Sequence, residues 1–459
     1  MIAFLLAITV TASAGTLISK KYQPQTVLLF TLTAIFFPAQ SVLFEDVESS
    51  GWSGFDIFEF VHQIMSYRLA GLGLIIMAAG GFAKYMDHIG ATRAMVNIGT
   101  RPLLRMQAPY VVLALGYAVG QVLNIFIPSA AGLAMLLLVT LYPTLVRLGV
   151  SKAAAAAMIG TTSVLDLGPA SGTANLAAYT ADMDVAIYFA EYQIPAALFI
   201  VPVICILTYF SAKYFDRRSG HDPKQDSAFE AESETPATDK KKKIPAFYAL
   251  LPILPLSMIL IFSKLLIHQI ELGVVTAMII GAVLGLFCEM VRKRHELQKV
   301  FKGFMSFFQG MGQMFTSIIS LIICAEFFAA GLSAIGAIDF MISSAQSVGF
   351  GLFGMTLITC LLVAVTTILT GSGNAAFFSF AGLAPGVTAS SVAGPVAILL
   401  PLQFTAGLAR ALSPVSGVII AVSEAAGCSP IDIVKRTAIP LIGGLIMLFA
   451  YTALFIGLE

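Results

Sequence analysis

The residues best suited to chemistry surround Arg410, in the segment "ARALSPVSG" at 409–417. Arg410 is the first basic residue after Lys302, so its guanidinium follows more than a hundred residues without Lys or Arg. A charge in the hydrocarbon region of a bilayer costs about 2.5–3.5 kcal/mol or more, so it should line a cavity or pair with an acid. Arg410 is predicted either to clamp a carboxylate through two parallel hydrogen bonds, or to pair internally with Asp166 or another acid, or to snorkel.

The residues after Arg410 predict an interrupted helix. Pro414 lacks a backbone donor and clashes with the preceding turn, and Gly417 permits non-helical backbone. Backbone groups freed by such a break must face protein or a polar cavity, where half-helix N-termini attract anions and C-terminal carbonyls attract cations. The alternative interpretation is that Pro, Ser and Gly here only adjust helix packing and kinks.

This break has a counterpart in the first half of the chain. "LSPVSG" at 412–417 is matched by "LGPASG" at 167–172, which lies 245 positions earlier. An offset of 246, with one residue added, aligns "GFAKYMDHIGA" at 81–91 with "EFFAAGLSAIGA" at 326–337. Several matches in the same order at a nearly constant offset predict an internal repeat.

The sequence also predicts two polar helix tips in addition to the two breaks. The offset of 246 takes Ser129, in "IPSAAG", to Ala375, at the end of the polar tip "TGSGNA". Tips and breaks at symmetry-related depths are predicted to converge on one site, where hydroxyls, amides and free backbone N–H groups can bind an anion. The candidate substrate-binding residues are Ser129, Ser171, Thr173, Asn175, Ser372, Gly373, Asn374, Arg410, Ser413 and Ser416.

Composition places these elements in a membrane. Of 459 residues, 58% are hydrophobic and 11% are charged, against about 25% charged in a soluble domain. Apolar runs of about 20 residues, each able to cross a bilayer, predict an all-α polytopic membrane protein. The predicted spanning runs are 2–18, 26–44, 69–87, 192–212, 246–266, 270–291, 306–331 and 437–457. The start, "MIAFLLAITVTASAG", lacks a basic segment before its apolar run, which favours a first spanning helix over a signal peptide.

The other apolar segments are not simple spans. Two are predicted to be helical pairs around a polar tip, 107–149 and 347–391, and two to be interrupted helices, 153–181 and 395–427. A hydrophilic segment rich in Pro, Ser, Glu and Lys, 213–244, predicts a flexible cytoplasmic linker. The predicted units are therefore a first repeat at 1–212 (scaffold helices 1–106, hairpin and broken helix 107–212), the linker, and a second repeat at 245–459 (scaffold helices 245–346, hairpin and broken helix 347–459).

Basic residues predict opposite orientations for the two halves. Short connections rich in Lys and Arg face the cytoplasm. The connection 84–105 is basic, whereas the connections poor in basic residues include 45–67 and 332–346, the second of which has no basic residue. The assignments alternate without conflict if both termini face the periplasm. This pattern predicts an inverted-topology repeat with two re-entrant hairpins, as in many secondary transporters.

Two acids in apolar surroundings are candidates for coupling to an ion. Asp166 precedes the first break, and it is predicted to be either a proton or Na⁺ site or the structural partner of Arg410. Glu326, in "IICAEFFAAG", is predicted either to relay protons or to face a scaffold interface.

Other classes of protein fit the sequence less well. The five cysteines form no CxxC or metal-ligand spacing, and neither they nor the five histidines suggest a metal or a cofactor. An intramembrane hydrolase needs a Ser activated by His or Lys, and no such residue lies near Ser171 or Ser416. A net charge of +1 gives no reason to expect a nucleic-acid partner. A channel would use a similar cavity without alternating access, and we expect a carrier and no enzyme.

Longer motifs resemble the DcuC family of anaerobic C4-dicarboxylate carriers. They are "TGSGNAAFF", "ARALSPVSGVIIAVS" and "SPIDIVKRTAIP", with "GFAKYMDHIGA", "APYVV" and "GVSKAAAAAMIG" earlier in the chain. The resemblance implies proton-coupled transport or exchange of succinate, fumarate, malate and aspartate across a bacterial inner membrane. It also implies a dimeric scaffold against which a transport domain moves, as in an elevator. The functional positions carried over are Ser372, Gly373, Asn374, Arg410, Ser413, Pro414 and Ser416.

The chain departs from that family pattern at Asp166, where the pattern is apolar, and at Glu326, where it lacks an acid. The sequence therefore predicts a secondary carrier of a small dicarboxylate, coupled to protons or Na⁺. The alternative is a carrier of the same fold for another small organic anion or an amino acid.

Overall fold

The protein is all-helical over the residues that its structure describes. This computed structural model describes residues 52–221, 244–263, 272–334, 351–388 and 394–457, with a few positions between 9 and 29. Seven helices in these ranges are long and apolar enough to cross a membrane, which confirms the predicted all-α polytopic architecture. The first two predicted spans, 2–18 and 26–44, lie largely outside the described residues.

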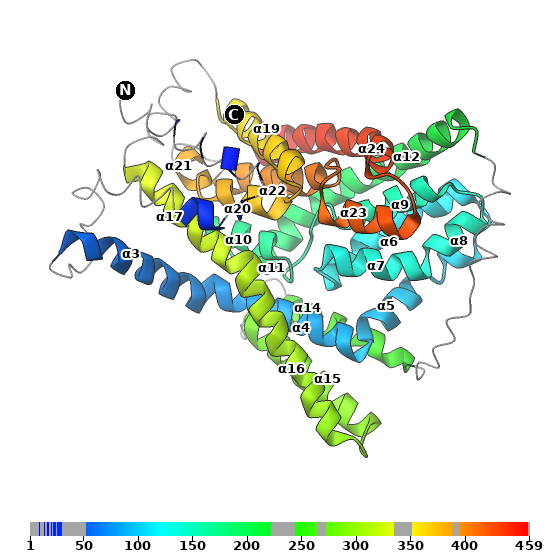
Figure 1. Ribbon diagram of the computed structural model, residues 1–459, viewed down its shortest axis with the longest axis horizontal. Helices are drawn as coiled ribbons and strands as arrows, with labels where there is room; N and C mark the ends of the chain where they lie inside the picture. Colours follow the sequence, from blue (N-terminus) through cyan, green and yellow to red (C-terminus); the bar gives the residue numbers. More distant parts are fainter. Residues whose placement is uncertain are drawn as a thin grey trace.

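The helices follow the same order in both halves: a long helix with a π-helical turn, a hairpin, a broken helix and a long final helix (Figure 1). Those of the first half are α3 (Ser53–Arg68), α4 (Leu74–Ile89), α5 (Ala91–Thr100), α6 (Pro109–Phe126), α7 (Ala130–Thr140), α8 (Tyr142–Arg147), α9 (Lys152–Thr161), α10 (Gly172–Thr180), α11 (Val185–Ile187) and α12 (Ile194–Arg218). Those of the second half are α14 (Ile253–Ile261), α15 (Val274–Arg292), α16 (Leu297–Met314), α17 (Ser320–Ala334), α19 (Leu352–Thr370), α20 (Gly373–Ala381), α21 (Ala384–Thr388), α22 (Val396–Arg410), α23 (Gly417–Ala426) and α24 (Pro430–Tyr451).

The π-helical turns repeat at the offset seen in the sequence. η1 (Leu69–Gly73) joins α3 to α4, and η5 (Phe315–Ile319) joins α16 to α17, so the two turns begin 246 positions apart. Helices α4 and α16 cross at glycines: a Cβ on Gly81 would lie 2.8 Å from the carbonyl oxygen of Phe307. Small residues thus let the two backbones touch, and the crossing pair forms the lower part of Figure 1.

Both predicted hairpins are present, and each has one short arm. The second arms, α7 and α20, have 11 and 9 residues, fewer than the roughly 20 that a bilayer requires. Each begins at a serine N-cap: the hydroxyl of Ser129 accepts from the N–H of Gly132 at 3.1 Å, and that of Ser372 accepts from the N–H of Ala375 at 3.3 Å. The counterpart of Ser129 is therefore Ser372, which corrects the predicted match to Ala375.

The two predicted helix interruptions are also confirmed. The first separates α9 from α10 at 162–171, and the second separates α22 from α23 at 411–416. In the first break Gly168 has a φ of 96° and Asp166 has a φ of 50°. Positive φ is uncommon outside glycine, and Asp is one of the residues that tolerate it best.

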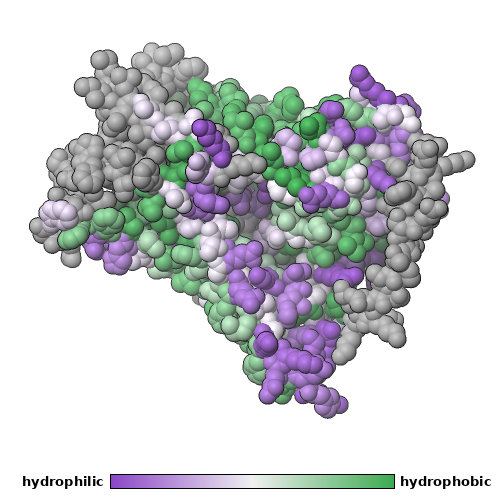
Figure 2. Space-filling model, in the orientation of Figure 1, coloured by the Kyte–Doolittle hydropathy of each residue, from purple (hydrophilic) through white to green (hydrophobic). Residues whose placement is uncertain are grey.

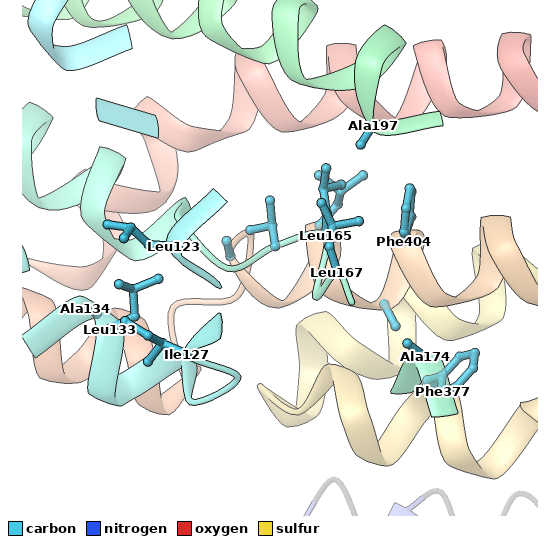
Figure 3. Close-up of a cluster of buried hydrophobic side chains, with 14 of the residues drawn as sticks. Leu123, Ile127, Leu133, Ala134, Leu165, Leu167, Ala174, Ala197, Phe377 and Phe404 are labelled. Carbon is cyan, nitrogen blue, oxygen red and sulfur yellow. The ribbon is translucent and has the colours of Figure 1, made fainter. Parts of the chain in front are cut away.

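The first break packs against the second half of the chain, and the second break packs against the second hairpin tip. Gly407 of α22 lies so close to the first break that a Cβ there would be 1.9 Å from the carbonyl oxygen of Val164. Gly371, at the second hairpin tip, has a φ of 76°, and its Cβ would lie 2.7 Å from the carbonyl oxygen of Val415. Figure 3 shows Leu165 of the first break in the same apolar cluster as Phe404 of α22.

Several predicted boundaries are wrong because tertiary contacts extend the helices. The connection expected at 45–67 is helical from Ser53, where α3 packs on α17 through Phe60 and Phe327, whose ring centroids are 6.2 Å apart. The linker expected from 213 begins later, since α12 continues to Arg218 and its last turns are held by an ion pair between Asp216 and Arg436 at 2.7 Å.

Further helices differ from their predicted spans. The run predicted at 192–212 lies in a longer helix that begins at Val185, and those at 306–331 and 437–457 belong to helices that begin at Leu297 and Pro430. The span predicted at 246–266 is a 3₁₀ turn (Ala246–Leu250) followed by the nine-residue α14, because prolines interrupt the helical hydrogen bonding. Most of the connection 332–346 and of the linker, 222–243, lies outside the described residues.

The contact at Gly407 predicts a stability defect. Gly407→Ala should lower the melting temperature of the detergent-solubilised protein, because the added Cβ forces the first break away from α22 at a cost of about 1–3 kcal/mol. The matched control is Gly382→Ala, where a Cβ would meet nothing within 4 Å. Equal melting temperatures for the two variants would show that the break is not held at this contact.

Candidate functional site

The tips and breaks surround one cavity of about 560 Å³. It lies between α4 and η5 on one side and the hairpin and broken-helix elements on the other, and Figure 2 shows a hollow with hydrophilic side chains between the crossing helices and the upper part of the molecule. The first turns of all four half-helices contribute to its lining, through Ala130 and Gly132 (α7), Gly172 (α10), Asn374 (α20) and Val418 (α23).

This convergence places several partial positive charges at the cavity. The N-terminus of a helix carries the equivalent of roughly +0.5 charge and unsatisfied N–H groups, so it binds anions readily. Four such ends meet at one cavity, and Arg410 adds a full charge from the last residue of α22. Among the described residues, the same lining includes the acids Asp166 and Asp87. The site is therefore suited to an anion, with carboxylates available for a cation or a proton.

Arg410 binds neutral oxygens of the first break. Its Nη2 donates to the carbonyl oxygen of Ser163 at 2.7 Å and to the Oγ of Ser163 at 3.2 Å. Asp166 lines the same cavity, but the described structure contains no direct ion pair between the two side chains. The Arg410–Asp166 pair considered from the sequence is thus not formed, because each side chain has a different hydrogen-bond partner.

Asp166 belongs to a buried polar network that joins the two halves. Its carboxylate accepts from the hydroxyl of Thr173 at 2.8 Å. Gln403 of α22 donates through Nε2 to the backbone oxygen of Asp166 at 3.2 Å and to Thr173 Oγ1 at 3.1 Å. Gln403 Oε1 in turn accepts from the Tyr188 hydroxyl at 2.8 Å and from Gln193 Nε2 at 3.1 Å. One amide therefore fixes the position of the first break against α22.

Five of the predicted residues line the cavity, and they come from a tip or a break in each half: Ser129, Asp166, Ser372, Asn374 and Arg410. The Asn374 amide has no hydrogen-bond partner among the described residues, so it is available to a ligand. Ser372 is partly exposed and caps α20.

The remaining predicted ligands lie behind the cavity wall. Ser171 caps α10 and bonds Thr173, and Asn175 Nδ2 donates to the carbonyls of Pro169 and Ser171, both at 2.7 Å. These side chains hold the first break. Three residues of the second half also lie behind the wall. Gly373 packs against the carbonyl of Ala406, and Ser413 donates to the carbonyl of Ile368 at 2.7 Å. Ser416 is the buried N-cap of α23, and its hydroxyl has no partner among the described residues.

Glu326 lies outside this site. It forms a two-fold ion pair with Arg68, at the end of α3, and is absent from the cavity lining among the described residues. The Arg68 guanidinium also lies over the ring of Tyr179 of α10, 4.8 Å from its centroid. This arrangement favours the scaffold-interface interpretation of Glu326.

Several polar side chains at or near the cavity were not predicted from the sequence. Gln403 and Ser163 sit in apolar stretches, and a polar residue within a spanning segment is a signal that can be found from sequence. Lys84 was assigned to a cytoplasmic connection by its charge, yet it lies in α4 and lines the cavity.

The comparison with known proteins defines the family. The DcuC family, described as C4-dicarboxylate anaerobic carrier, matches residues 2–457. The chain belongs to this family. The probable anaerobic C4-dicarboxylate transporter DcuC of Vibrio cholerae serotype O1 is 31% identical over 465 residues, which cover 100% of this chain and 99% of that protein. The anaerobic C4-dicarboxylate transporter DcuC of Shigella flexneri is 34% identical over 431 residues, 94% of this chain and 90% of that protein.

DcuC membership confirms two predictions from the sequence, the resemblance itself and a transporter that is not an enzyme. A solved structure supports the fold. The Alcanivorax borkumensis YdaH transporter, whose crystal structure has an unusual topology, superposes with a TM-score of 0.54 over 94% of this chain and 98% of that chain. At 13% identity this likeness concerns the fold alone.

The hydrogen bonds of Gln403 predict that its loss destabilises the protein. Gln403→Leu should lower the melting temperature in detergent, because it leaves the Tyr188 hydroxyl and the Gln193 amide buried without their partner, at about 1–3 kcal/mol for each unpaired group. Gln107→Leu, at an exposed position, is the control and should leave the melting temperature unchanged. A fully stable Gln403→Leu protein would contradict the role given to this amide.

Proposed function

We propose that this DcuC family member is a secondary active carrier of C4-dicarboxylates, namely succinate, fumarate, malate and aspartate. The observation that carries the proposal is the meeting of four half-helix N-termini and Arg410 at one cavity, which suits a small dianion. The names of its relatives, anaerobic C4-dicarboxylate transporters, support the same substrate class.

In the proposed binding mode Arg410 clamps one carboxylate. The Asn374 amide and the Ser372 hydroxyl, from the second tip, hydrogen-bond the same anion, with Ser129 on the opposite tip. The residues behind the wall hold the half-helices in place: Ser171, Thr173, Asn175, Gly373, Ser413 and Ser416. Asp166, which accepts one hydrogen bond and has no ion-pair partner among the described residues, is suited to the ammonium group of aspartate.

The proposed architecture is two inverted-topology repeats, at 1–212 and 245–459, joined by a cytoplasmic linker. The repeated order of helices and the common offset of the π-helical turns support it. The hairpins and broken helices would move as a transport domain against the scaffold helices of a homodimer, in an elevator-type cycle. The location proposed is the bacterial inner membrane.

For coupling we propose Asp166 over Glu326. A proton or Na⁺ at Asp166 would reach the substrate cavity directly, whereas Glu326 already has Arg68 as its counter-charge. Symport and exchange both fit this site. The second substrate candidate, another small organic anion or an amino acid, rests on the same cavity, because it holds charges of both signs.

Purified protein in liposomes tests the function directly. Counterflow of labelled succinate into vesicles preloaded with unlabelled acid should occur with fumarate, malate and aspartate inside and fail with unrelated monocarboxylates. Counterflow only with a different class of acid or amino acid would replace C4-dicarboxylates by that class.

Arg410 variants test the clamp. Arg410→Ala should abolish succinate counterflow while the protein still folds, because no other described cation lies in the broken-helix wall. Arg410→Lys keeps the charge but loses the planar fork, so transport should be weakened and still measurable. Wild-type affinity in a folded Arg410→Ala protein would end the clamp hypothesis.

Tip variants test the hydrogen bonds. Ser372→Ala and Asn374→Ala should each raise the transport KM by about ten-fold or more, since a hydrogen bond to a charged group is worth about 1.5–3 kcal/mol. Ser379→Ala, further along α20 and bonded to its own helix, is the control. If both tip variants behave like this control, the second tip does not contact substrate.

A further inference from the structure

A second cation faces the same cavity from the opposite wall. Lys84 belongs to α4, one of the crossing helices, whereas Arg410 ends the broken helix α22. These are the two basic side chains that line the cavity among the described residues. The two charges therefore come from different halves of the chain and from different sides of the space that a ligand would occupy.

Lys84 forms no ion pair with an acid among the described residues. Its Nζ donates to Oε1 of Gln313 at 3.1 Å, and Gln313, from the end of α16, also lines the cavity. Asp87 lies one turn further along α4 and faces the same space, yet the described structure shows no ion pair between it and Lys84. A lysine has three donors, so an ammonium held by one neutral amide keeps both its charge and hydrogen-bonding capacity.

A dicarboxylate needs two cationic partners if both of its charges leave bulk water, because an unpaired buried charge is costly. Arg410 accounts for one carboxylate. We propose that Lys84, positioned by Gln313, recognises the second carboxylate from the scaffold wall and so discriminates dicarboxylates from monocarboxylates. This assignment rests on the proposed function.

The position of Lys84 at the cavity wall indicates which kinetic step it affects. A compact, hydrated ammonium at a polar cavity wall attracts an anion over a distance and is screened by salt. Its contribution should thus appear in substrate capture, as a change in KM with little change in turnover. A singly charged analogue occupies Arg410 alone and gains nothing from Lys84.

The test compares succinate with monomethyl succinate, which has the same carbon chain and one charge fewer. Lys84→Gln in proteoliposomes should raise the KM for succinate about ten-fold at low ionic strength, leave turnover within two-fold, and leave the inhibition constant of monomethyl succinate unchanged. Lys84→Arg should retain most of the discrimination. Lys435→Gln, on an exposed face of α24 outside this cavity, should match the wild type.

A second variant keeps the test valid if Lys84→Gln does not fold. Gln313→Glu keeps the size of the side chain and places a carboxylate on the Lys84 ammonium, so it should neutralise the charge and raise the succinate KM as well. The proposal is overturned if the folded variants keep the wild-type KM, or if succinate and monomethyl succinate lose affinity equally. Wild-type protein that moves no dicarboxylate would instead remove the proposed function on which it rests.

Discussion

A helix broken inside an apolar layer frees backbone groups that have no water to bind, and this constraint shapes the whole molecule. The chain meets it by placing the N-termini of four half-helices, two at hairpin tips and two at breaks, around one polar cavity. Serine caps satisfy one N–H at each of three half-helices, and the fourth cap, Ser416, is buried. The same arrangement that limits the cost of the breaks leaves several partial positive charges at a common point.

Close packing, both between the halves and within the second half, keeps these ends together. A carbonyl of the first break touches α22 where Gly407 has no side chain, and the second tip touches the second break at Gly371. Gln403 then ties the backbone of Asp166 to the second half through hydrogen bonds. The guanidinium of Arg410 completes the contact by binding Ser163, so the guanidinium is itself held by the half of the chain that does not contain it.

The crossing helices supply the other wall. Glycines allow α4 and α16 to touch, and the π-helical turns lie at equivalent positions in the two long helices. Beyond the cavity, Arg68 pairs with Glu326 of α17 and lies over the ring of Tyr179 of α10, so one guanidinium contacts both a long helix and a broken-helix element. The cavity therefore lies at a boundary between two sets of helices, and among the described residues each set contributes one cation to its lining, Arg410 or Lys84.

The sequence by itself determined the class of protein, the hairpins, the breaks, the repeat offset and five residues of the cavity lining. Apolar runs, Pro and Gly have local consequences for helices in lipid, and such signals need no knowledge of distant contacts. Only the tertiary structure decided which polar atoms remain free. Ser413 and Thr173 were predicted as ligands from the sequence, but their hydroxyls donate hydrogen bonds to neighbours that folding brings close. Glu326 pairs with Arg68, which lies 258 positions away in the sequence. Lys84, which was predicted to lie in a connection, lines the cavity wall. Hydrogen bonds and ion pairs join side chains through space, and their geometry is set by how helices cross, which a one-dimensional pattern does not contain.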